Sequence, residues 1–341
     1  MESPEYVQTS TAAAITLKLF PGRFYRGARL KALNLLLTYS EGCRASCAYC
    51  GLSRKRVPLS GRTFIRVDWP TFATDEIIAR ANTYGKHLER VCISMVTHPR
   101  AYQDTLTLVR RFREETPLAI STLISPTLMK SKEMLAELKR AGAEMCGIAV
   151  DCATPELFDA LRGRGMQGPH RWEHYWRVVD WAVAVFGRLN VSVHLIVGLG
   201  ESEREMLAAV QRAYDAGAEA HLFAFYPEPG SVMQEHERPG IEQYRRVQLA
   251  RYLIHRNLAR YQDMRFSTRG EVVDFGVSRQ VLEEVIEEGK AFMTSGCRGR
   301  DGEVACNRPY GNERPGEVLR NFPFLPSEED KRLIRRHLGL A

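Results

Sequence analysis

Six short apolar runs, rich in β-branched residues, alternate along the chain with longer stretches of helical periodicity. The runs predict strands at residues 34–38, 91–96, 118–123, 145–150, 191–197 and 220–225. The stretches between them predict helices at residues 69–88, 102–115, 130–141, 155–162, 170–186 and 203–216. Consecutive strand–helix units with right-handed connections form a parallel sheet that curls toward a full or partial (β/α) barrel. In such a barrel the functional residues lie at the carboxyl ends of the strands.

Composition narrows the class of protein further. The chain has 341 residues and a net charge of +7, and no stretch approaches the ~20 apolar residues that span a bilayer. The excess positive charge favours acidic partners and anionic ligands. Nucleic acid is not an expected partner, because the basic residues are scattered and not interleaved with aromatic residues. Free cysteines without a secretory signal lead us to expect a reducing, cytoplasmic location.

Three cysteines follow the first predicted strand at short spacing. Cys43, Cys47 and Cys50 are separated by three and then two residues, a spacing at which thiolates can hold three corners of a four-iron cluster. The fourth iron is then open, as in catalytic rather than structural metal centres. A tetrahedral zinc site is the alternative, but it needs a nearby fourth ligand, and the first histidine after this loop is His87. Disulfides are disfavoured in a chain without a secretory signal.

The motif C-x3-C-x2-C, with Tyr49 directly before its last cysteine, resembles the signature of the radical SAM superfamily. The resemblance implies an α/β fold, a partial (β/α)6 barrel of the TIM type, with the cluster loop after the first strand. It also implies that Cys43, Cys47 and Cys50 bind a 4Fe-4S cluster, that S-adenosyl-L-methionine (SAM) binds the open iron, and that Tyr49 adjoins SAM. We expect the barrel at residues 31–260, an N-terminal extension at 1–30 and a C-terminal extension at 261–341.

Two further strand ends resemble SAM-binding elements of the same superfamily. Residues 193–201, V-H-L-I-V-G-L-G-E, are similar to the element G-x-I-x-G-x-x-E, with His194 in place of its first glycine. The turn around Pro227 is similar to the turn F-x-P-x-x-G-T of biotin synthase and its relatives. These similarities imply contacts with SAM from Ile196, Gly198, Glu201 and Pro227.

The methionine part of SAM is expected near the end of the fourth strand. Asp151 would bind the ribose hydroxyls, and the pair Arg162 and Arg164 the carboxylate, through charge-assisted hydrogen bonds. The alternative for Arg162 is a solvated helix end. The GGE-like turn that often follows the second strand of radical SAM enzymes is absent, because residues 94–99 read S-M-V-T-H-P.

A second group of cysteines is separated widely in the sequence. Cys297 and Cys306 flank a glycine-rich loop, and Cys92 lies in a V-C-x-x-x strand similar to one that provides a ligand to the auxiliary cluster of biotin synthase. The similarity implies that these three cysteines hold a second cluster; the alternative is packing, since cysteine is often buried. Cys146 and Cys152 are expected in the core, although either could complete the ligand set.

The end of the chain and the strands together resemble the radical SAM subunits of two-component, archaeal-type lipoyl synthases. The residues concerned are Cys297, Cys306, N-R-P-Y at 307–310 and N-E-R-P-G at 312–316. Biotin synthase itself is not expected, because Thr122 and His194 lie where that enzyme has further cysteines.

The lipoyl synthase resemblance implies a sulfurtransferase of lipoate biosynthesis. Such an enzyme generates a 5′-deoxyadenosyl radical and inserts sulfur into C–H bonds of a protein-bound octanoyl chain. The implied partners are an octanoylated lipoyl domain or glycine-cleavage carrier protein, a second radical SAM subunit, and an electron donor such as ferredoxin or flavodoxin. Two alternatives remain: a single-cluster enzyme that rearranges or cleaves an amino-acid-derived substrate, and a non-catalytic iron–sulfur redox or scaffold protein.

Overall fold

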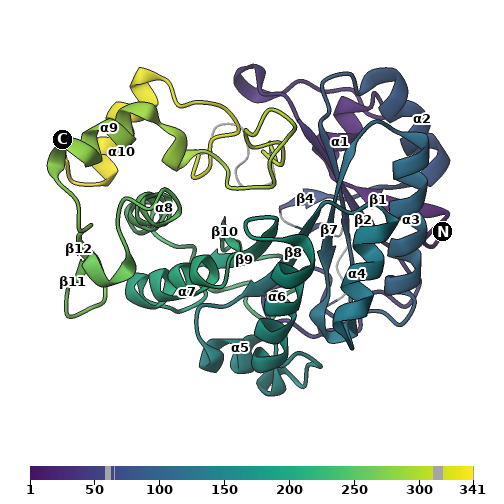
Figure 1. The fold of residues 1–341 in the computed structure, drawn as a ribbon, viewed down its shortest axis with the longest axis horizontal. Coiled ribbons are helices and arrows are strands. Elements are labelled where there is room, and N and C mark those ends of the chain that lie inside the picture. Colours follow the sequence, from purple (N-terminus) through teal and green to yellow (C-terminus); the bar gives the residue numbers. More distant parts are fainter. Residues whose placement is uncertain (58–62, 65, 310–317, 341) are drawn as a thin grey trace.

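The computed structural model of the chain describes residues 1–57, 63–64, 66–309 and 318–340 (Figure 1). Its centre is an eight-stranded sheet with the strand order β10-β9-β8-β7-β6-β2-β1-β5. Six of these strands are parallel neighbours: β2 (Ala32–Leu37), β6 (Arg90–Ser94), β7 (Ala119–Ile124), β8 (Met145–Asp151), β9 (Val191–Val197) and β10 (Glu219–Ala224). Each lies within two residues of its predicted position. The prediction of a partial (β/α)6 barrel is therefore confirmed.

Two antiparallel strands at one edge of the sheet were not predicted. They are β1 (Tyr6–Thr9), which pairs with β2, and β5 (Thr71–Ala73), which pairs with β1. The predicted helix 69–88 is accordingly wrong in its first turn, because α2 begins only at Thr74 and ends at Tyr84. Pro70 favours extended backbone just before it, and an unpaired edge of β1 offers hydrogen-bond partners to the residues that follow. A two-stranded ribbon, β3 (Thr63–Phe64) with β4 (Val67–Asp68), precedes this edge.

The other barrel helices lie where the periodicity places them, to within two residues. They are α3 (Ala101–Glu115), α4 (Lys132–Ala141), α5 (Pro155–Leu161), α6 (Trp172–Phe186) and α7 (Glu203–Asp215). Local chemistry fixes their ends: Pro155 occupies the first turn of α5, and Ser202 with Glu205 forms a capping box on α7. No helix in the described part of the chain is long and apolar enough to cross a membrane.

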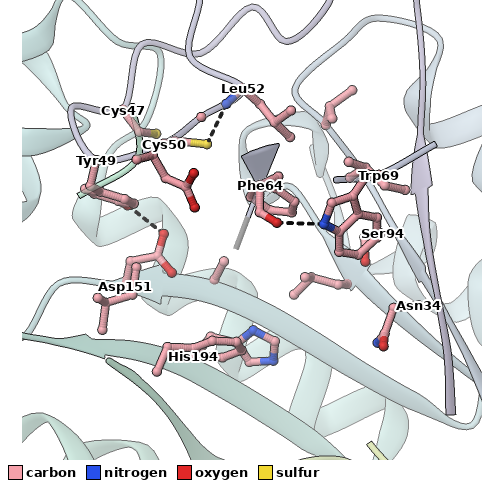
Figure 2. A pocket seen from close by; sticks show the side chains of 18 of the residues that line it. Asn34, Cys47, Tyr49, Cys50, Leu52, Phe64, Trp69, Ser94, Asp151 and His194 are labelled. Atoms are coloured by element: carbon pink, nitrogen blue, oxygen red, sulfur yellow. Dashed lines mark hydrogen bonds between the residues drawn. The ribbon is translucent and has the colours of Figure 1, made fainter. Parts of the chain in front are cut away.

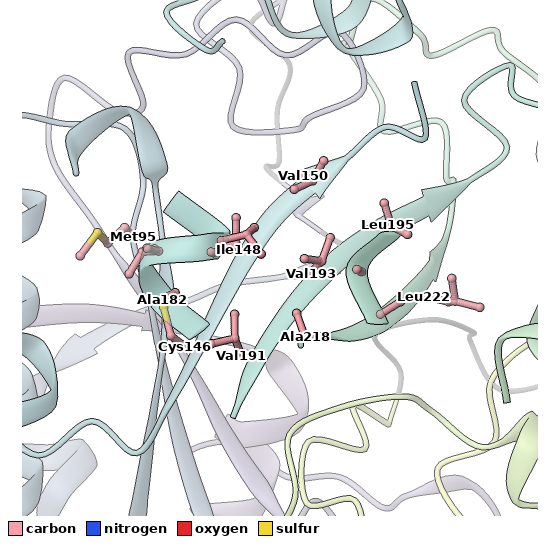
Figure 3. Packing of buried hydrophobic residues seen from close by; sticks show 14 of the residues in the cluster. Met95, Cys146, Ile148, Val150, Ala182, Val191, Val193, Leu195, Ala218 and Leu222 are labelled. Atoms are coloured by element: carbon pink, nitrogen blue, oxygen red, sulfur yellow. The ribbon is translucent and has the colours of Figure 1, made fainter. Parts of the chain in front are cut away.

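Alternating residues of the strands face opposite sides of the sheet, as the two-residue period of a strand requires. On β8 and β9, Ile148, Val150, Val193 and Leu195 are fully buried on the side that packs against the helices (Figure 3). Each such side chain contributes about 1.5–3 kcal/mol of burial free energy. Cys146 belongs to this layer (Figure 3). The residues between them on these strands face the barrel interior.

The C-terminal part of the chain forms a helical region and then returns to the sheet. Its elements are α8 (Ile241–His255), β11 (Arg265–Phe266), β12 (Val272–Asp274), α9 (Arg279–Glu288) and α10 (Glu328–His337). In Figure 1, α9 and α10 lie at the opposite end of the molecule from α2 and α3. The N-terminal extension adds α1 (Thr11–Thr16) to β1.

The segment after α9 covers the amino ends of the barrel strands. The backbone N–H of Leu222 in β10 donates to Ser295 Oγ at 2.8 Å, and Arg90 Nε, at the start of β6, donates to the carbonyl of Arg298 at 2.8 Å. Asn307 donates to the carbonyl of Arg29 at 2.7 Å, just before β2. Cys297 and Cys306 are thus carried to the barrel, whereas residues 310–316 of the predicted tail motif lie outside the described residues.

Candidate active site

The cysteine loop begins where β2 ends and lies over the carboxyl ends of the neighbouring strands. Gly42, with φ of +69°, provides the turn into the loop. The backbone N–H of Arg44 donates to the carbonyl of Thr97 beyond β6, and that of Ala48 to Leu161 at the end of α5, both at 2.8 Å. The loop is therefore held by two other βα units, which fixes it relative to the barrel mouth.

All three cysteines of this loop line one cavity of about 270 Å³. The backbone N–H of Ala45 donates to Cys43 Sγ and that of Leu52 to Cys50 Sγ, each at 3.4 Å (Figure 2 shows the second). Burial raises the pKa of Cys47 to about 11 and raises that of Cys50 well above its ordinary value. Buried thiols of this kind become thiolates when a metal supplies the compensating positive charge.

The donor set fits a 4Fe-4S cluster with three protein ligands. Three thiols with N–H donors directed at two of their sulfurs are typical of such a site, and the adjoining cavity leaves room beside an open iron. Among the described residues, no group of three or more His, Cys, Asp or Glu side chains has the arrangement of ligands to a metal ion. The cysteines of a four-iron cluster bind separate irons, so they need not converge on one point.

Asp151 joins two of the other predicted residues at the end of β8. A bulge in its pairing with β9 and a φ of +64° turn the residue out of the strand. Its Oδ2 accepts hydrogen bonds from the Tyr49 hydroxyl and from Arg162 NH1, both at 2.6 Å (Figure 2 shows the first). The three side chains line the cavity beside the cysteine loop. The structure thus brings together residues that lie up to 113 positions apart in the sequence.

Arg162 is not a solvated helix end, because it is only 4% exposed. Its NH1 also donates to the carbonyls of Ala149 and Val150, at 2.6 and 2.9 Å, and its NH2 donates to the Tyr175 hydroxyl at 3.1 Å. These bonds orient Arg162 toward Asp151 and leave Nε without a hydrogen-bond partner among the described residues. Contact of Arg162 with the carboxylate of SAM stays a prediction.

Glu201 holds the turn that ends β9. Its carboxylate accepts hydrogen bonds from the backbone N–H groups of Gly198 at 2.7 Å and Leu199 at 2.9 Å. Gly198 has φ of +100°, and a Cβ there would lie 2.7 Å from Pro239, so only glycine fits. Ile196 lines the cavity, whereas Gly198, Glu201 and Pro227 are not among the described residues that do. Glu201 therefore shapes the strand end instead of facing the cavity.

Substituting Glu201 by glutamine is expected to remove a pH dependence of SAM binding. Burial raises the pKa of Glu201 to about 7, although the hydrogen bonds from backbone N–H groups lower it. The ionised carboxylate, which accepts with both oxygens, therefore forms as the pH rises through 7. SAM affinity of the wild type should rise with it. At pH 8, Glu201→Gln should bind SAM roughly tenfold more weakly, because it keeps one acceptor. Equilibrium binding between pH 6 and 8 measures this, and an unchanged slope in the variant would contradict it.

The same carboxyl group affects folding stability with the opposite sign. Its folded-state pKa lies above the unfolded value of about 4.3, so the folded state binds the proton more tightly. The resulting stabilisation is complete below the unfolded pKa and is lost as the pH rises through 7. Urea unfolding of wild type and Glu201→Gln across this range separates the stability effect from the binding effect.

The second group of cysteines meets through a hairpin in the C-terminal segment. The backbones of Arg298 and Val304 pair, and the N–H groups of Ala305 and Cys306 donate to the carbonyl of Cys297 at 3.0 and 3.1 Å. Gly296 permits this approach, because a Cβ there would lie 2.3 Å from the carbonyl oxygen of Cys306. The hairpin thus places two cysteines side by side despite the eight residues between them.

Two of these three cysteines reach the cavity. Cys92, in the middle of β6, and Cys306 line it, whereas Cys297 packs behind Cys306 with Ala305 and Met145. Burial, and then the Cys306 and Cys297 thiols, raise the pKa of Cys92 well above its ordinary value. The structure therefore brings Cys92 and Cys306 to the cavity that the first cysteine loop also lines, and places Cys297 next to Cys306 but outside that lining.

Sequence reasoning missed two polar side chains around this second set. Asn34 Nδ2 donates to Cys306 Sγ at 3.6 Å, and Arg308, whose guanidinium lies 4.1 Å from the centre of the Phe223 ring, reaches the same sulfur at 4.0 Å. Both line the cavity. A polar residue inside the run Leu33-Asn34-Leu35 is a signal that could have identified the first of them. Arg308 lies within the motif N-R-P-Y at 307–310, but the motif alone does not indicate that its side chain reaches the cavity, because its neighbours come from distant strands.

Residues 37–213, just over half of the chain, match the profile of the radical SAM superfamily. The chain therefore belongs to this superfamily. Membership implies a 4Fe-4S cluster and SAM as cofactors, in agreement with the fit of the cysteine loop. Among curated proteins, no sequence matches the chain significantly.

Solved structures with a similar fold share little sequence with the chain. Methylornithine synthase (PylB) is 17% identical, with a TM-score of 0.48 over 67% of this chain and 61% of that chain. HydG, a maturase of the FeFe-hydrogenase, is 12% identical, with a TM-score of 0.48 over 71% and 52%. Coproporphyrinogen III oxidase (HemN) from Escherichia coli is 16% identical, with a TM-score of 0.37 over 49% and 40%. The chain thus covers less than two thirds of each of these proteins.

Proposed function

We propose that this radical SAM enzyme is a lipoyl-synthase-like sulfurtransferase that inserts sulfur into unactivated C–H bonds of a protein-bound octanoyl chain. The observation that carries the proposal is one cavity that both cysteine groups share. The loop of Cys43, Cys47 and Cys50 lines it, and so do Cys92 on β6 and Cys306 of the C-terminal hairpin. Sulfur insertion needs a radical generator and a sulfur source around one substrate. In this proposal the first cysteine group holds the radical generator and the second group holds the sulfur source.

The chemistry that a 4Fe-4S cluster with SAM supplies when bound is reductive cleavage of SAM to methionine and a 5′-deoxyadenosyl radical, which abstracts hydrogen from a C–H bond. A second cluster, held by Cys92, Cys297 and Cys306, would supply sulfide. The protein orients the substrate between them and excludes water. The buried Tyr49–Asp151–Arg162 group fixes the wall beside the first site, which limits misplacement of the reacting carbon.

The walls of the cavity suit an alkyl chain. Most of the residues that line it are apolar or aromatic, and they come from several elements. Examples are Leu30, Leu36, Phe64, Trp69, Met95, Leu123, Ile196 and Phe225. Beyond its carbonyl, an octanoyl chain presents no polar group to recognise, so its binding depends on apolar burial, at ~0.8 kcal/mol per buried CH₂. This lining favours an unactivated aliphatic substrate over an amino-acid-derived one.

The proposed protein partner is an acidic octanoylated carrier, such as a lipoyl domain or a glycine-cleavage carrier protein. The net charge of +7 supports an acidic partner, and Arg44, Arg54 and Lys55 are exposed around the cysteine loop. Arg54→Glu with Lys55→Glu should weaken carrier binding, and unchanged binding would reject this part of the proposal. An electron donor such as ferredoxin or flavodoxin, and a second radical SAM subunit for the second sulfur, complete the proposed set of partners.

The direct test is anaerobic incubation of the reconstituted enzyme with octanoylated carrier peptide, SAM and dithionite. Mass spectrometry of the peptide should show the gain of a sulfur atom together with 5′-deoxyadenosine. Formation of 5′-deoxyadenosine from SAM without any sulfur-containing peptide would contradict the proposal.

Iron analysis provides an independent check. Two four-iron clusters require about eight irons and eight sulfides per chain, whereas a single-cluster enzyme contains about four of each. A reconstituted wild-type protein that saturates at about four irons would exclude the second cluster, and with it the sulfur source.

A further inference from the structure

His194 lies on β9 beside the cavity, between two other strands. It is in register with Ala149 of β8 and His221 of β10, and its ring points into the pocket (Figure 2). The ring packs at 5.1 Å from the Phe223 ring and 5.5 Å from the His221 ring, measured between centroids. These contacts fix the ring on its strand and leave its edge directed into the interior.

The ring nitrogens of His194 have no hydrogen-bond partner among the described residues, whereas those of the neighbouring His221 and His255 do. His221 Nε2 lies 3.4 Å from Glu219 Oε2, and His255 Nε2 accepts a hydrogen bond from the backbone N–H of Ala220 at 3.2 Å. The half-buried imidazole of His194 is open to the cavity, and its nitrogens can there form a hydrogen bond or bind a metal. Its position is explained if a ligand in the cavity supplies the missing interaction.

The nearest features of the cavity indicate which ligand that is. Phe223, which touches His194, carries the Arg308 guanidinium on its face, and Arg308 reaches Cys306 Sγ. His194, Cys92 and Cys306 all line the cavity. Imidazole and thiolate ligands occur together on iron–sulfur clusters, as in Rieske centres. Asn34 and Arg308 differ from these residues, because they donate N–H bonds to the Cys306 sulfur. Such bonds orient a metal ligand and do not replace it.

We infer that His194 is the fourth protein ligand of the second cluster, beside Cys92, Cys297 and Cys306. The inference rests on the proposed function, because it requires that cluster. Four protein ligands leave no open iron, so this cluster would not bind SAM, which separates its role from that of the first cluster. An imidazole in place of a thiolate also raises the reduction potential of a cluster.

The ligand can be observed without an activity measurement. The full-length chain with Cys43, Cys47 and Cys50 all replaced by alanine retains only the second site. This variant is produced with ¹⁵N-labelled histidine, reconstituted with iron and sulfide, reduced with dithionite, and examined by pulsed EPR. A strongly coupled ¹⁵N nucleus is expected. The coupling should disappear when His194→Ala or His194→Cys is added.

A matched control is His221→Gln, because His221 packs against His194 but is not among the described residues that line the cavity. This variant should keep the coupling. His194→Cys guards against misfolding, since a thiolate can replace the imidazole: it should keep about four irons, lose the coupling and shift the reduction potential to a more negative value.

The possible failures can be distinguished. If the triple-alanine chain binds no cluster, the second cluster and the role of His194 both fall. If it binds a cluster without histidine coupling, or if the coupling survives in His194→Cys, the assignment of His194 alone is overturned and the proposed function stands.

Discussion

Substituting Cys50 by alanine is expected to lower the rate of 5′-deoxyadenosine formation by at least ~10³-fold, equivalent to about 4 kcal/mol of activation free energy. Cys50 is one of three thiols that can hold the first cluster, and its sulfur accepts an N–H bond from Leu52 at 3.4 Å. Among the described residues of this loop, no further cysteine is present that could replace Cys50 as a ligand. The variant should also lose about four irons per chain, which iron analysis and liquid chromatography of the nucleoside product would measure.

The matched control is Cys146→Ala. Cys146 is also a free cysteine, but, unlike Cys50, it is fully buried and packs on the helix side of the sheet with Ile148 and Ala182 (Figure 3). Its loss should cost about 1 kcal/mol of folding stability and leave both the iron content and 5′-deoxyadenosine formation unchanged. Loss of iron from Cys146→Ala would show that Cys146 contributes to metal binding and is not only a packing residue. Normal nucleoside formation by Cys50→Ala would contradict the assignment of the cysteine loop.

The sequence predicted the features that depend on local chemistry. The strand runs and helical periods gave six βα units, since burial of one face imposes the period of each element. The spacing of Cys43, Cys47 and Cys50 is itself local, so it indicated the cluster loop without any knowledge of the fold. Right-handed crossovers then placed Asp151 at the same end of the barrel as this loop.

The sequence did not predict features that depend on contacts between distant segments. The bond between Asn34 and Cys306 joins residues 272 positions apart, and no local pattern specifies that the C-terminal segment closes the amino ends of the strands. Strand β5 was mistaken for the start of a helix, because its extended form depends on pairing with β1. The sequence indicated Glu201 as a contact of SAM, which stays a prediction, but it did not reveal that the Glu201 carboxylate accepts hydrogen bonds from the backbone of its own turn.

Substituting Cys306 by alanine should separate the two halves of the proposed reaction. The thiol of Cys306 lies in the cavity near Asn34 and Arg308, away from the Tyr49–Asp151–Arg162 wall. The first cluster and the SAM site should therefore remain, and 5′-deoxyadenosine should form within about threefold of the wild-type rate, an activation difference below ~0.7 kcal/mol. The yield of sulfur-containing peptide per 5′-deoxyadenosine should fall by at least ~10²-fold, because the sulfur source is lost.

The ratio of sulfur-containing peptide to 5′-deoxyadenosine is the quantity to measure, because general damage to the protein would lower the yield of both products. Cys146→Ala again serves as the control and should leave the ratio unchanged. If Cys306→Ala still converts the octanoyl peptide to a sulfur-containing product, sulfur must come from elsewhere, and the hairpin that joins Cys297 to Cys306 has a structural role only. If the variant retains about eight irons, Cys306 is not a ligand. A variant that retains about four irons, makes 5′-deoxyadenosine and releases the peptide without sulfur identifies the cavity as the place where the carbon radical meets its sulfur donor.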